Sequence, residues 1–204
     1  MMSLTSEIII VSGLPRSGTS LMMQMLHQGG IPVVTDEIRT ADTDNPRGYY
    51  EFERVKKTKE DSSWLPDARG KVVKMVSSLL YDLPATEAYR IVFMRRDINE
   101  MLESQEKMLA RLSRTAAPRD QIKKSFSIHL DRLFQWFPAQ PHIKLLEVSY
   151  NDLLHAPEAE ICRVAEFLNH FPSASLMLAA IDPDLYRNRR SIHAPDQILS
   201  NKVD

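Results

Sequence analysis

A short loop of small and hydroxyl side chains near the N-terminus is the part of the sequence best suited to bind an anion. Residues 13–20 read G-L-P-R-S-G-T-S and follow the apolar run 8–11. Gly13 and Gly18 allow backbone conformations that other residues resist, and apolar residues at helical spacing follow the loop. Backbone N–H groups at the N-terminus of a helix attract negative charge. The segment therefore predicts a strand, a phosphate-binding loop and a helix.

The loop differs from the ATP-binding pattern G-x-x-x-x-G-K-[ST] at one informative position. Gly13, Gly18 and Ser20 match, but Thr19 stands at the lysine position and the cation of the loop is Arg16. A plain strand-to-helix turn is the alternative interpretation, and such a turn would need neither the arginine nor the cluster of hydroxyls. The composition of the loop therefore favours phosphate binding.

A second basic turn follows a second apolar run, residues 91–94. Arg96 and Asp97 end this run, and Ser104 lies eight residues after Arg96. At 3.6 residues per turn, Ser104 would lie about two turns into the next helix, so that it and Arg96 can contact one phosphate. A solvated charge pair followed by an ordinary helical serine is the alternative. Two anion sites on alternating strands and helices are what a nucleotide with two phosphate positions needs.

Together these segments resemble the sulfotransferases that use 3′-phosphoadenosine 5′-phosphosulfate (PAPS) as the sulfuryl donor. The loop reads P-R-S-G-T-S, and the 5′-phosphosulfate loop of that family is usually P-[KR]-S-G-T-[ST]. The resemblance implies that Arg16 contacts the 5′-phosphate and the oxygen that bridges it to sulfur. The cradle would be completed by Ser17, Gly18, Thr19 and Ser20. Fixed donors aimed at the bridging oxygen would stabilise the negative charge that develops there.

The second segment is similar to the motif with which this family holds the 3′-phosphate. In that motif a strand ends in Arg-Asp and a serine follows eight residues after the arginine, as Arg96, Asp97 and Ser104 do here. The resemblance implies that Arg96 and Ser104 both contact the 3′-phosphate. The proline that usually follows Arg-Asp is Ile98 in this sequence.

A third segment, residues 42–53, supplies candidates for acceptor binding. It reads D-T-D-N-P-R-G-Y-Y-E-F-E and resembles the N-P-[KR]-G-[FY]-x-E segment of bacterial members of the family. The Asn-Pro pair and the glycine mark a turn. We expect the aromatic residues after this turn to form a wall that lines an apolar or sugar-stacking acceptor site: Tyr49, Tyr50 and Phe52.

Glu51, in the same segment, is the candidate general base. An acceptor hydroxyl is a poor nucleophile until its proton is removed, and a carboxylate held close to it can remove that proton. Glu53 is the first competitor for this role and His27 is the next. Both acids lie in a charge-rich stretch where solvated surface carboxylates are common, so a surface role for Glu51 stays open.

Lys74 is the third candidate for catalysis. It lies inside the apolar run K-V-V-K-M-V, where an unpaired ammonium group would be costly. The resemblance implies that a lysine near this point steadies the sulfuryl group during transfer. A lysine that extends along the edge of a strand to reach water is the alternative.

The C-terminal half carries a segment similar to the family, a lone cysteine and a group of arginines. Residues 144–169 resemble the V-x-Y-E-D-L strand end of the family and the helix after it, which we interpret as structural. Cys162 lies on that helix, and a lone cysteine among apolar neighbours predicts a buried side chain. Three arginines near the end of the chain either close over the nucleotide or form a solvated tail: Arg187, Arg189 and Arg190.

Composition sets the frame for these motifs. With 204 residues, 43% of them apolar, and no linker or repeat, residues 1–204 are expected to form one domain with one core. Strands alternating with helices predict an α/β fold of P-loop nucleotide-binding type, with a mostly parallel sheet, helices on both faces and the ligand at the carboxyl ends of the strands. Residues 125–137 predict an amphipathic helix that packs on the sheet.

Charge and cysteine usage exclude several classes of partner. A net charge of −1 argues against a nucleic-acid surface, and the N-terminal apolar run is too short for a signal peptide or a membrane span. The single cysteine fits a reducing cytoplasm. It has no His/Cys cluster of metal-ligand spacing around it, so no metal is expected.

The resemblance implies transfer of a sulfuryl group from PAPS to a hydroxyl or amine of a small-molecule, lipid or sugar acceptor, without a metal. A P-loop nucleotide kinase or phosphohydrolase is the first alternative. It is disfavoured by the missing loop lysine and by the lack of an obvious metal-binding aspartate at a strand end. A nucleotide-binding module without catalysis is the second alternative.

Overall fold

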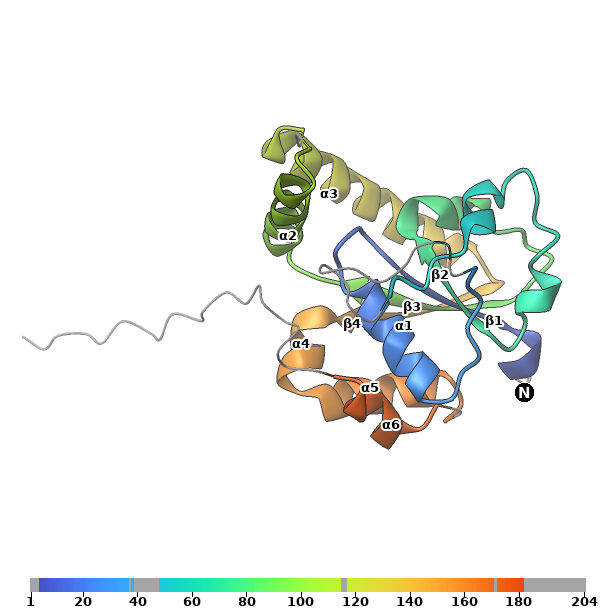
Figure 1. Cartoon of the computed structure of the whole chain (residues 1–204). Helices are drawn as coiled ribbons and strands as arrows, with labels where there is room; N and C mark the ends of the chain where they lie inside the picture. Colours follow the sequence, from blue (N-terminus) through green and yellow to red (C-terminus); the bar gives the residue numbers. More distant parts are fainter. Residues whose placement is uncertain (1–3, 37, 39–47, 115–116, 171, 182–204) are drawn as a thin grey trace, which may run out of the picture.

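The computed structural model describes residues 4–36, 38, 48–114, 117–170 and 172–181, and its centre is a parallel sheet (Figure 1). Each neighbouring pair of strands in this four-stranded sheet runs parallel, in the spatial order β2-β1-β3-β4. The strands are β1 (Ile8–Gly13), β2 (Val72–Val76), β3 (Tyr89–Arg95) and β4 (Ile143–Ser149). The predicted α/β fold with a parallel sheet is confirmed.

Helices make up the crossover connections that parallel strands require. The α-helices are α1 (Thr19–Gln28), α2 (Ile98–Arg111), α3 (Arg119–Trp136), α4 (Tyr150–His155), α5 (Pro157–Phe167) and α6 (Ala174–Ala179). Short 3₁₀ segments complete the connections: η1 (Leu4–Ser6), η2 (Glu53–Lys57), η3 (Pro66–Ala68), η4 (Ser77–Asp82) and η5 (Phe137–Ala139). Among the described residues, none of the helices has the length and apolar character needed to cross a lipid bilayer.

Two hydrophobic layers cover the two faces of the sheet, as the sequence predicts. In β1, Ile9 and Val11 face one layer and Ile8 and Ile10 face the other, because successive side chains of a strand point to opposite faces. The first layer comes from α1, α4, α5 and α6 with Leu4 of η1, and the second from α3 and the segments η2 to η5 (Figure 1). Complete burial of an isoleucine side chain contributes about 1.5–3 kcal/mol to stability.

The carboxyl ends of the central strands meet at one edge of the sheet. The register places Gly13 beside Val76 of β2 on one side and beside Met94 of β3 on the other. The chain passes from β1 to β2 on one side and then crosses to β3 on the opposite side, so the strand order reverses between β1 and β3. Ligands of open α/β sheets bind in the crevice at such a switch point.

An ion-pair network lies at the opposite edge, near the start of the strands. The buried carboxylate of Glu7 accepts hydrogen bonds from Arg90 of β3 and from Lys144 of β4, the latter at 2.8 Å. Arg90 also donates to the main-chain oxygen of Phe167 at the end of α5. Burial alone would raise the pKa of Glu7, but the hydrogen bonds from Lys144 and Arg90 outweigh it and hold the pKa below its ordinary value.

The C-terminal helices agree with the sequence analysis except at the cysteine. Pro157 begins α5, and the predicted apolar face of that helix is buried, with Ile161 and Val164 in the first layer. The prediction for Cys162 was wrong: its side chain is exposed. Cys162 follows Ile161 directly and therefore points about 100° away around the helix axis, toward solvent.

Candidate active site

The loop after β1 is tightly folded over the end of the sheet. Arg16 has a left-handed backbone conformation, with φ of 68°, and the N–H of Ser17 donates to the carbonyl oxygen of Leu14 at 3.2 Å. Gly18 is the N-cap residue of α1, with φ of 100°. A Cβ atom on Gly18 would lie 2.3 Å from Cδ2 of Tyr150, so only glycine fits there. These constraints hold the loop in one shape.

Several hydrogen-bond donors of this loop gather at the start of α1. The hydroxyl oxygen of Ser17 is buried and, within the described part of the chain, has no hydrogen-bond partner. Thr19 and Ser20 open α1, and the first N–H groups of a helix have no partner inside the helix. A buried unpaired hydroxyl is costly, so a ligand oxygen at this point would satisfy it. The loop therefore fits an anion.

Arg16 links this loop to the second basic segment. Its Nε donates to the Oγ of Ser104 at 3.0 Å, and its Nη1 lies 3.9 Å from the Sδ of Met108. Ser104 is the seventh residue of α2, about two turns from its start as predicted, and it is buried. The structure thus brings residues from the two predicted phosphate sites into direct contact.

Contacts with both charged and aromatic groups hold Arg96 in place just after β3. Its Nη1 donates to the carbonyl oxygen of Arg16 at 3.2 Å, and its Nε donates to Glu100 at 3.1 Å. Its guanidinium carbon lies 4.3 Å from the centre of the Tyr150 ring. The side chain of Arg96 is only 7% exposed. Glu100 and Tyr150 are supporting residues that the sequence analysis did not find.

Asp97, the acid beside Arg96, has a structural role. Its carboxylate caps α2 by accepting hydrogen bonds from the main-chain N–H groups of Asn99 and Glu100, at 2.9 and 3.1 Å. This cap fixes where α2 begins, and therefore fixes the position of Ser104 two turns later. Ile98 begins the helix in place of the usual proline.

Lys74 reaches from β2 to the start of α1. Its Nζ donates to the Oγ of Ser20 at 3.0 Å and to the carbonyl oxygen of Tyr49 at 2.8 Å. The side chain is 12% exposed, and Nζ lies 4.0 Å from Oε1 of Glu51. Lys74 therefore stands between the loop and the candidate base.

Glu51 is positioned through its own main chain. Its carbonyl oxygen accepts hydrogen bonds from the hydroxyl of Thr35 at 2.9 Å and from the N–H of Asp36 at 3.3 Å. Asp36 also accepts from the N–H of Glu53 at 2.6 Å, which fastens the segment on both sides of Glu51. The side chain of Glu51 is 28% exposed and faces Lys74. Sequence reasoning did not find the contribution of Asp36.

The two competing bases lie differently. Glu53 forms an ion pair with Lys56 at 2.6 Å and its side chain is 45% exposed. His27 occupies the last turn of α1, about 12 Å along the helix axis from Thr19 at its start. Its ring meets the ring of Tyr50 edge to face, with the ring centres 5.8 Å apart. Of the three candidates, Glu51 is the one whose carboxylate lies 4.0 Å from the ammonium group of Lys74.

The predicted aromatic wall does not form a single surface. Tyr49 is buried near Lys74, whose Nζ lies 5.8 Å from the ring centre. Tyr50 packs against His27, and Phe52 packs edge to face on Trp64 in the second hydrophobic layer. Tyr50 has a positive φ of 53°, which turns the chain between its neighbours. The Asn-Pro turn before these residues and the C-terminal arginines Arg187, Arg189 and Arg190 lie outside the described residues.

Comparison with known proteins agrees with this geometry. A family model described as a sulfotransferase domain matches residues 6–182, which include the loop and the second basic segment. This chain belongs to the sulfotransferase domain family. The resemblance found in the sequence is therefore confirmed. A search of curated proteins gave no match at the significance required.

Solved structures of other sulfotransferase domains share the fold. One, from the curacin biosynthetic pathway, has 15% sequence identity and a TM-score of 0.51, with 88% of this chain and 79% of that chain covered. Another, from the Synechococcus PCC 7002 olefin synthase, has 14% identity and a TM-score of 0.56, with coverage of 91% and 81%. At these identities the likeness shows a common fold.

Proposed function

We propose that this sulfotransferase uses PAPS as its donor and transfers the sulfuryl group to a hydroxyl or amine of a small-molecule, lipid or sugar acceptor. One observation carries the proposal: Arg16, Arg96 and Ser104 converge at the switch point of the sheet, next to the buried hydroxyl of Ser17. A donor with phosphates at both the 3′ and 5′ positions needs two adjoining anion sites of this kind.

The loop and the second basic segment divide the donor between them in this proposal. Ser17, Gly18, Thr19 and Ser20 surround the 5′-phosphate with main-chain and hydroxyl donors at the start of α1. Arg96 and Ser104 hold the 3′-phosphate. Arg16 lies between the two groups and places positive charge near the bridging oxygen. The donor is a co-substrate, so binding and release accompany each turnover.

The proposed chemistry follows from the side chains that surround the start of α1. The hydroxyl oxygen or amine nitrogen of the acceptor attacks the sulfur atom, and Glu51 accepts the proton that this group loses. The bond between sulfur and the bridging oxygen breaks, and its electron pair stays on the phosphate of adenosine 3′,5′-bisphosphate. Lys74 and Arg16 stabilise the charge that develops on the sulfuryl and bridging oxygens. The tether of Lys74 to Ser20 and Tyr49 keeps the ammonium group in place before the reaction begins.

The contact between Lys74 and Ser20 also distinguishes this site from that of a kinase or phosphohydrolase. In the ATP-binding pattern, the hydroxyl at the position of Ser20 binds Mg²⁺. Here that hydroxyl accepts a hydrogen bond from the ammonium group of Lys74 at 3.0 Å. In this proposal a cation of the protein lies next to the donor phosphates, which favours transfer without a metal.

A thermal-shift panel tests donor use before any acceptor is known. We expect adenosine 3′,5′-bisphosphate to raise the melting temperature in the presence of EDTA, and Mg-ATP to raise it less. Saturation a hundredfold above the dissociation constant adds about 2.7 kcal/mol of stability. No shift with millimolar bisphosphate, together with a clear shift with Mg-ATP, would support the kinase alternative instead. Binding without turnover of any acceptor panel would support the non-catalytic module.

A further inference from the structure

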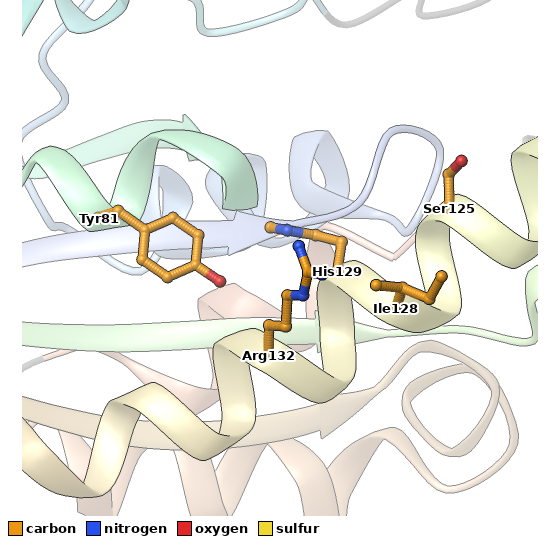
Figure 2. A pocket seen from close by; sticks show the side chains of 5 residues that line it. All are labelled: Tyr81, Ser125, Ile128, His129 and Arg132. Carbon is orange, nitrogen blue, oxygen red and sulfur yellow. The ribbon is translucent and has the colours of Figure 1, made fainter.

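A pocket lies on the α3 side of the sheet, near the carboxyl end of β2. It has a volume of about 620 Å³ and opens to solvent between η4 and α3. Figure 2 shows Tyr81 from η4 facing a row of side chains from α3. The α3 residues are Ser125, Ile128, His129 and Arg132, which lie at i, i+3, i+4 and i+7 and therefore share one face of the helix. None of the predicted donor-binding residues lines this pocket.

The floor of the pocket is connected to the end of β2. Nε2 of His129 lies 2.9 Å from Oγ of Ser77, the buried residue that directly follows β2. Ser77 comes three residues after Lys74, so their Cα atoms are about 10 Å apart at the usual rise of a strand. The pocket therefore lies by the carboxyl end of β2, and an acceptor bound in it would extend across this edge of the sheet to reach the ammonium group of Lys74, which contacts Ser20 on the α1 side.

The walls of the pocket offer an apolar surface. Tyr81 and Ile128, which line the pocket, are 41% and 40% exposed. They are two of the seven large hydrophobic side chains that the described residues expose. Exposed apolar side chains gathered at a concave site mark a binding surface more often than isolated ones do. The volume also lies in the range of small-molecule sites.

Arg132 gives the pocket a positive charge. Within the described part of the chain, the guanidinium of Arg132 forms no ion pair. His129 is the other nitrogen-bearing side chain in the lining, and burial lowers its pKa, which favours the neutral ring near pH 7. The pocket therefore combines an apolar wall with a single full positive charge among its lining residues.

We propose that this pocket binds the acceptor and selects a hydroxylated organic acid: its apolar body lies on Tyr81 and Ile128, and its carboxylate pairs with Arg132. The proposal rests on the proposed sulfuryl transfer and narrows its acceptor class. A planar guanidinium binds a carboxylate through two parallel hydrogen bonds, which fixes the orientation of the acid. The hydroxyl end is then directed toward Lys74 and Glu51.

A matched pair of probes tests the charge requirement without knowledge of the natural acceptor. The acid is 3-(4-hydroxyphenyl)propanoate, and the neutral partner is 3-(4-hydroxyphenyl)propan-1-ol, which keeps the ring, the phenol and the chain. Binding is measured by ligand-observed NMR with the bisphosphate-saturated protein. We expect the acid to bind about fivefold more tightly, the scale of a partly exposed charged contact. Equal affinity, or no binding of either probe at millimolar concentration, overturns the proposal.

Two variants and a control locate the effect. Arg132→Met should remove the preference for the acid, whereas Ile128→Asn should weaken both probes equally. Lys124→Met removes an exposed cation on the same helix outside the pocket lining, and it should leave both affinities unchanged. Melting temperatures of all three variants report that the fold is intact. A preference for the acid that survives Arg132→Met places the anion site elsewhere and overturns the proposal.

Failure of this inference and failure of the proposed function give different results. If the bisphosphate does not bind but the acid still binds through Arg132, the donor assignment is wrong and the anion pocket stands. If the bisphosphate binds and the preference for the acid is absent, the donor assignment stands and the acceptor class is wrong.

Discussion

Arg96 has two roles that a pair of substitutions separates. In the structure it neutralises Glu100, whose side chain is 10% exposed, and in the proposed function it also binds the 3′-phosphate. Arg96→Met keeps most of the side-chain length but leaves the Glu100 carboxylate buried without its cation. Breaking a buried pair in this way costs about 3–5 kcal/mol. The stacking on Tyr150 adds a smaller loss, about 0.5–1 kcal/mol. We therefore expect Arg96→Met to lower the free energy of unfolding by several kcal/mol.

The double variant Arg96→Met/Glu100→Met removes both charges. Replacing a buried pair by apolar side chains of similar volume is often neutral, so most of the stability should return. The 3′-phosphate contact should not return. A charge-assisted hydrogen bond contributes about 1.5–3 kcal/mol, so the double variant should bind adenosine 3′,5′-bisphosphate about 10- to 150-fold more weakly than the unmodified protein.

Two measurements on the same proteins test these expectations. Urea denaturation gives the free energy of unfolding, and isothermal titration calorimetry gives the affinities for adenosine 3′,5′-bisphosphate and for adenosine 5′-monophosphate, which lacks the 3′-phosphate. The double variant should lose affinity for the bisphosphate and keep its weaker affinity for the monophosphate. Equal losses for both ligands would show that Arg96 does not bind the 3′-phosphate, and an unchanged bisphosphate affinity would refute the proposed site.

Three further predictions address the loop, the base and the ion-pair network. Gly18→Ala should lower the melting temperature strongly, because the added Cβ atom would clash with the ring of Tyr150. Gly30→Ala is the control: Gly30 has a similar φ of 101° but no atom within 4 Å of the added Cβ, so this variant should show only the cost of backbone strain. Glu51→Gln should lower turnover about a hundredfold or more with little change in bisphosphate affinity, and Glu53→Gln should leave turnover near normal; the reverse pattern would exchange their roles. Because the pKa of Glu7 is lowered in the folded state, its contribution to stability is complete above the ordinary pKa of about 4.3 and is lost as the pH falls further. Urea midpoints between pH 6 and pH 3 should therefore fall less in Glu7→Gln than in the unmodified protein.

The parts of the site that local sequence patterns control could be predicted. The loop over 13–20 depends on glycine and on a helix N-terminus, both of which are visible in neighbouring residues. Arg96 and Ser104 both contact Arg16, and this arrangement depends on the spacing of one strand end and one helix. Because the carboxyl ends of parallel strands lie at one edge, the closeness of the two segments predicted to bind phosphate also followed from the sequence.

Contacts between distant segments could not be predicted in this way. Nothing near Arg96 in the sequence indicates that Tyr150 will stack on its guanidinium, since the two are brought together by the pairing of β3 with β4. The pairing of Arg96 with Glu100 is equally hidden, because Arg96 lies before α2 begins at Ile98 and the two residues do not share a helix face. The prediction of a single aromatic wall was wrong because the positive φ at Tyr50 turns the chain and separates the three rings. A positive φ at a non-glycine residue has no clear signal in the sequence.

The contact between Arg16 and Ser104 gives a physical reason for an arginine in this loop. The Oγ of Ser104 accepts a hydrogen bond from Nε of Arg16, which leaves the hydroxyl hydrogen of Ser104 available for a ligand oxygen. A guanidinium has five donors in a fixed plane, so Arg16 can orient Ser104 through Nε and still present other N–H groups to a ligand. A lysine has one ammonium group at the end of a flexible chain and would have to choose between these partners. The arginine therefore links the two proposed phosphate sites, because Arg16 of the first site orients Ser104 of the second.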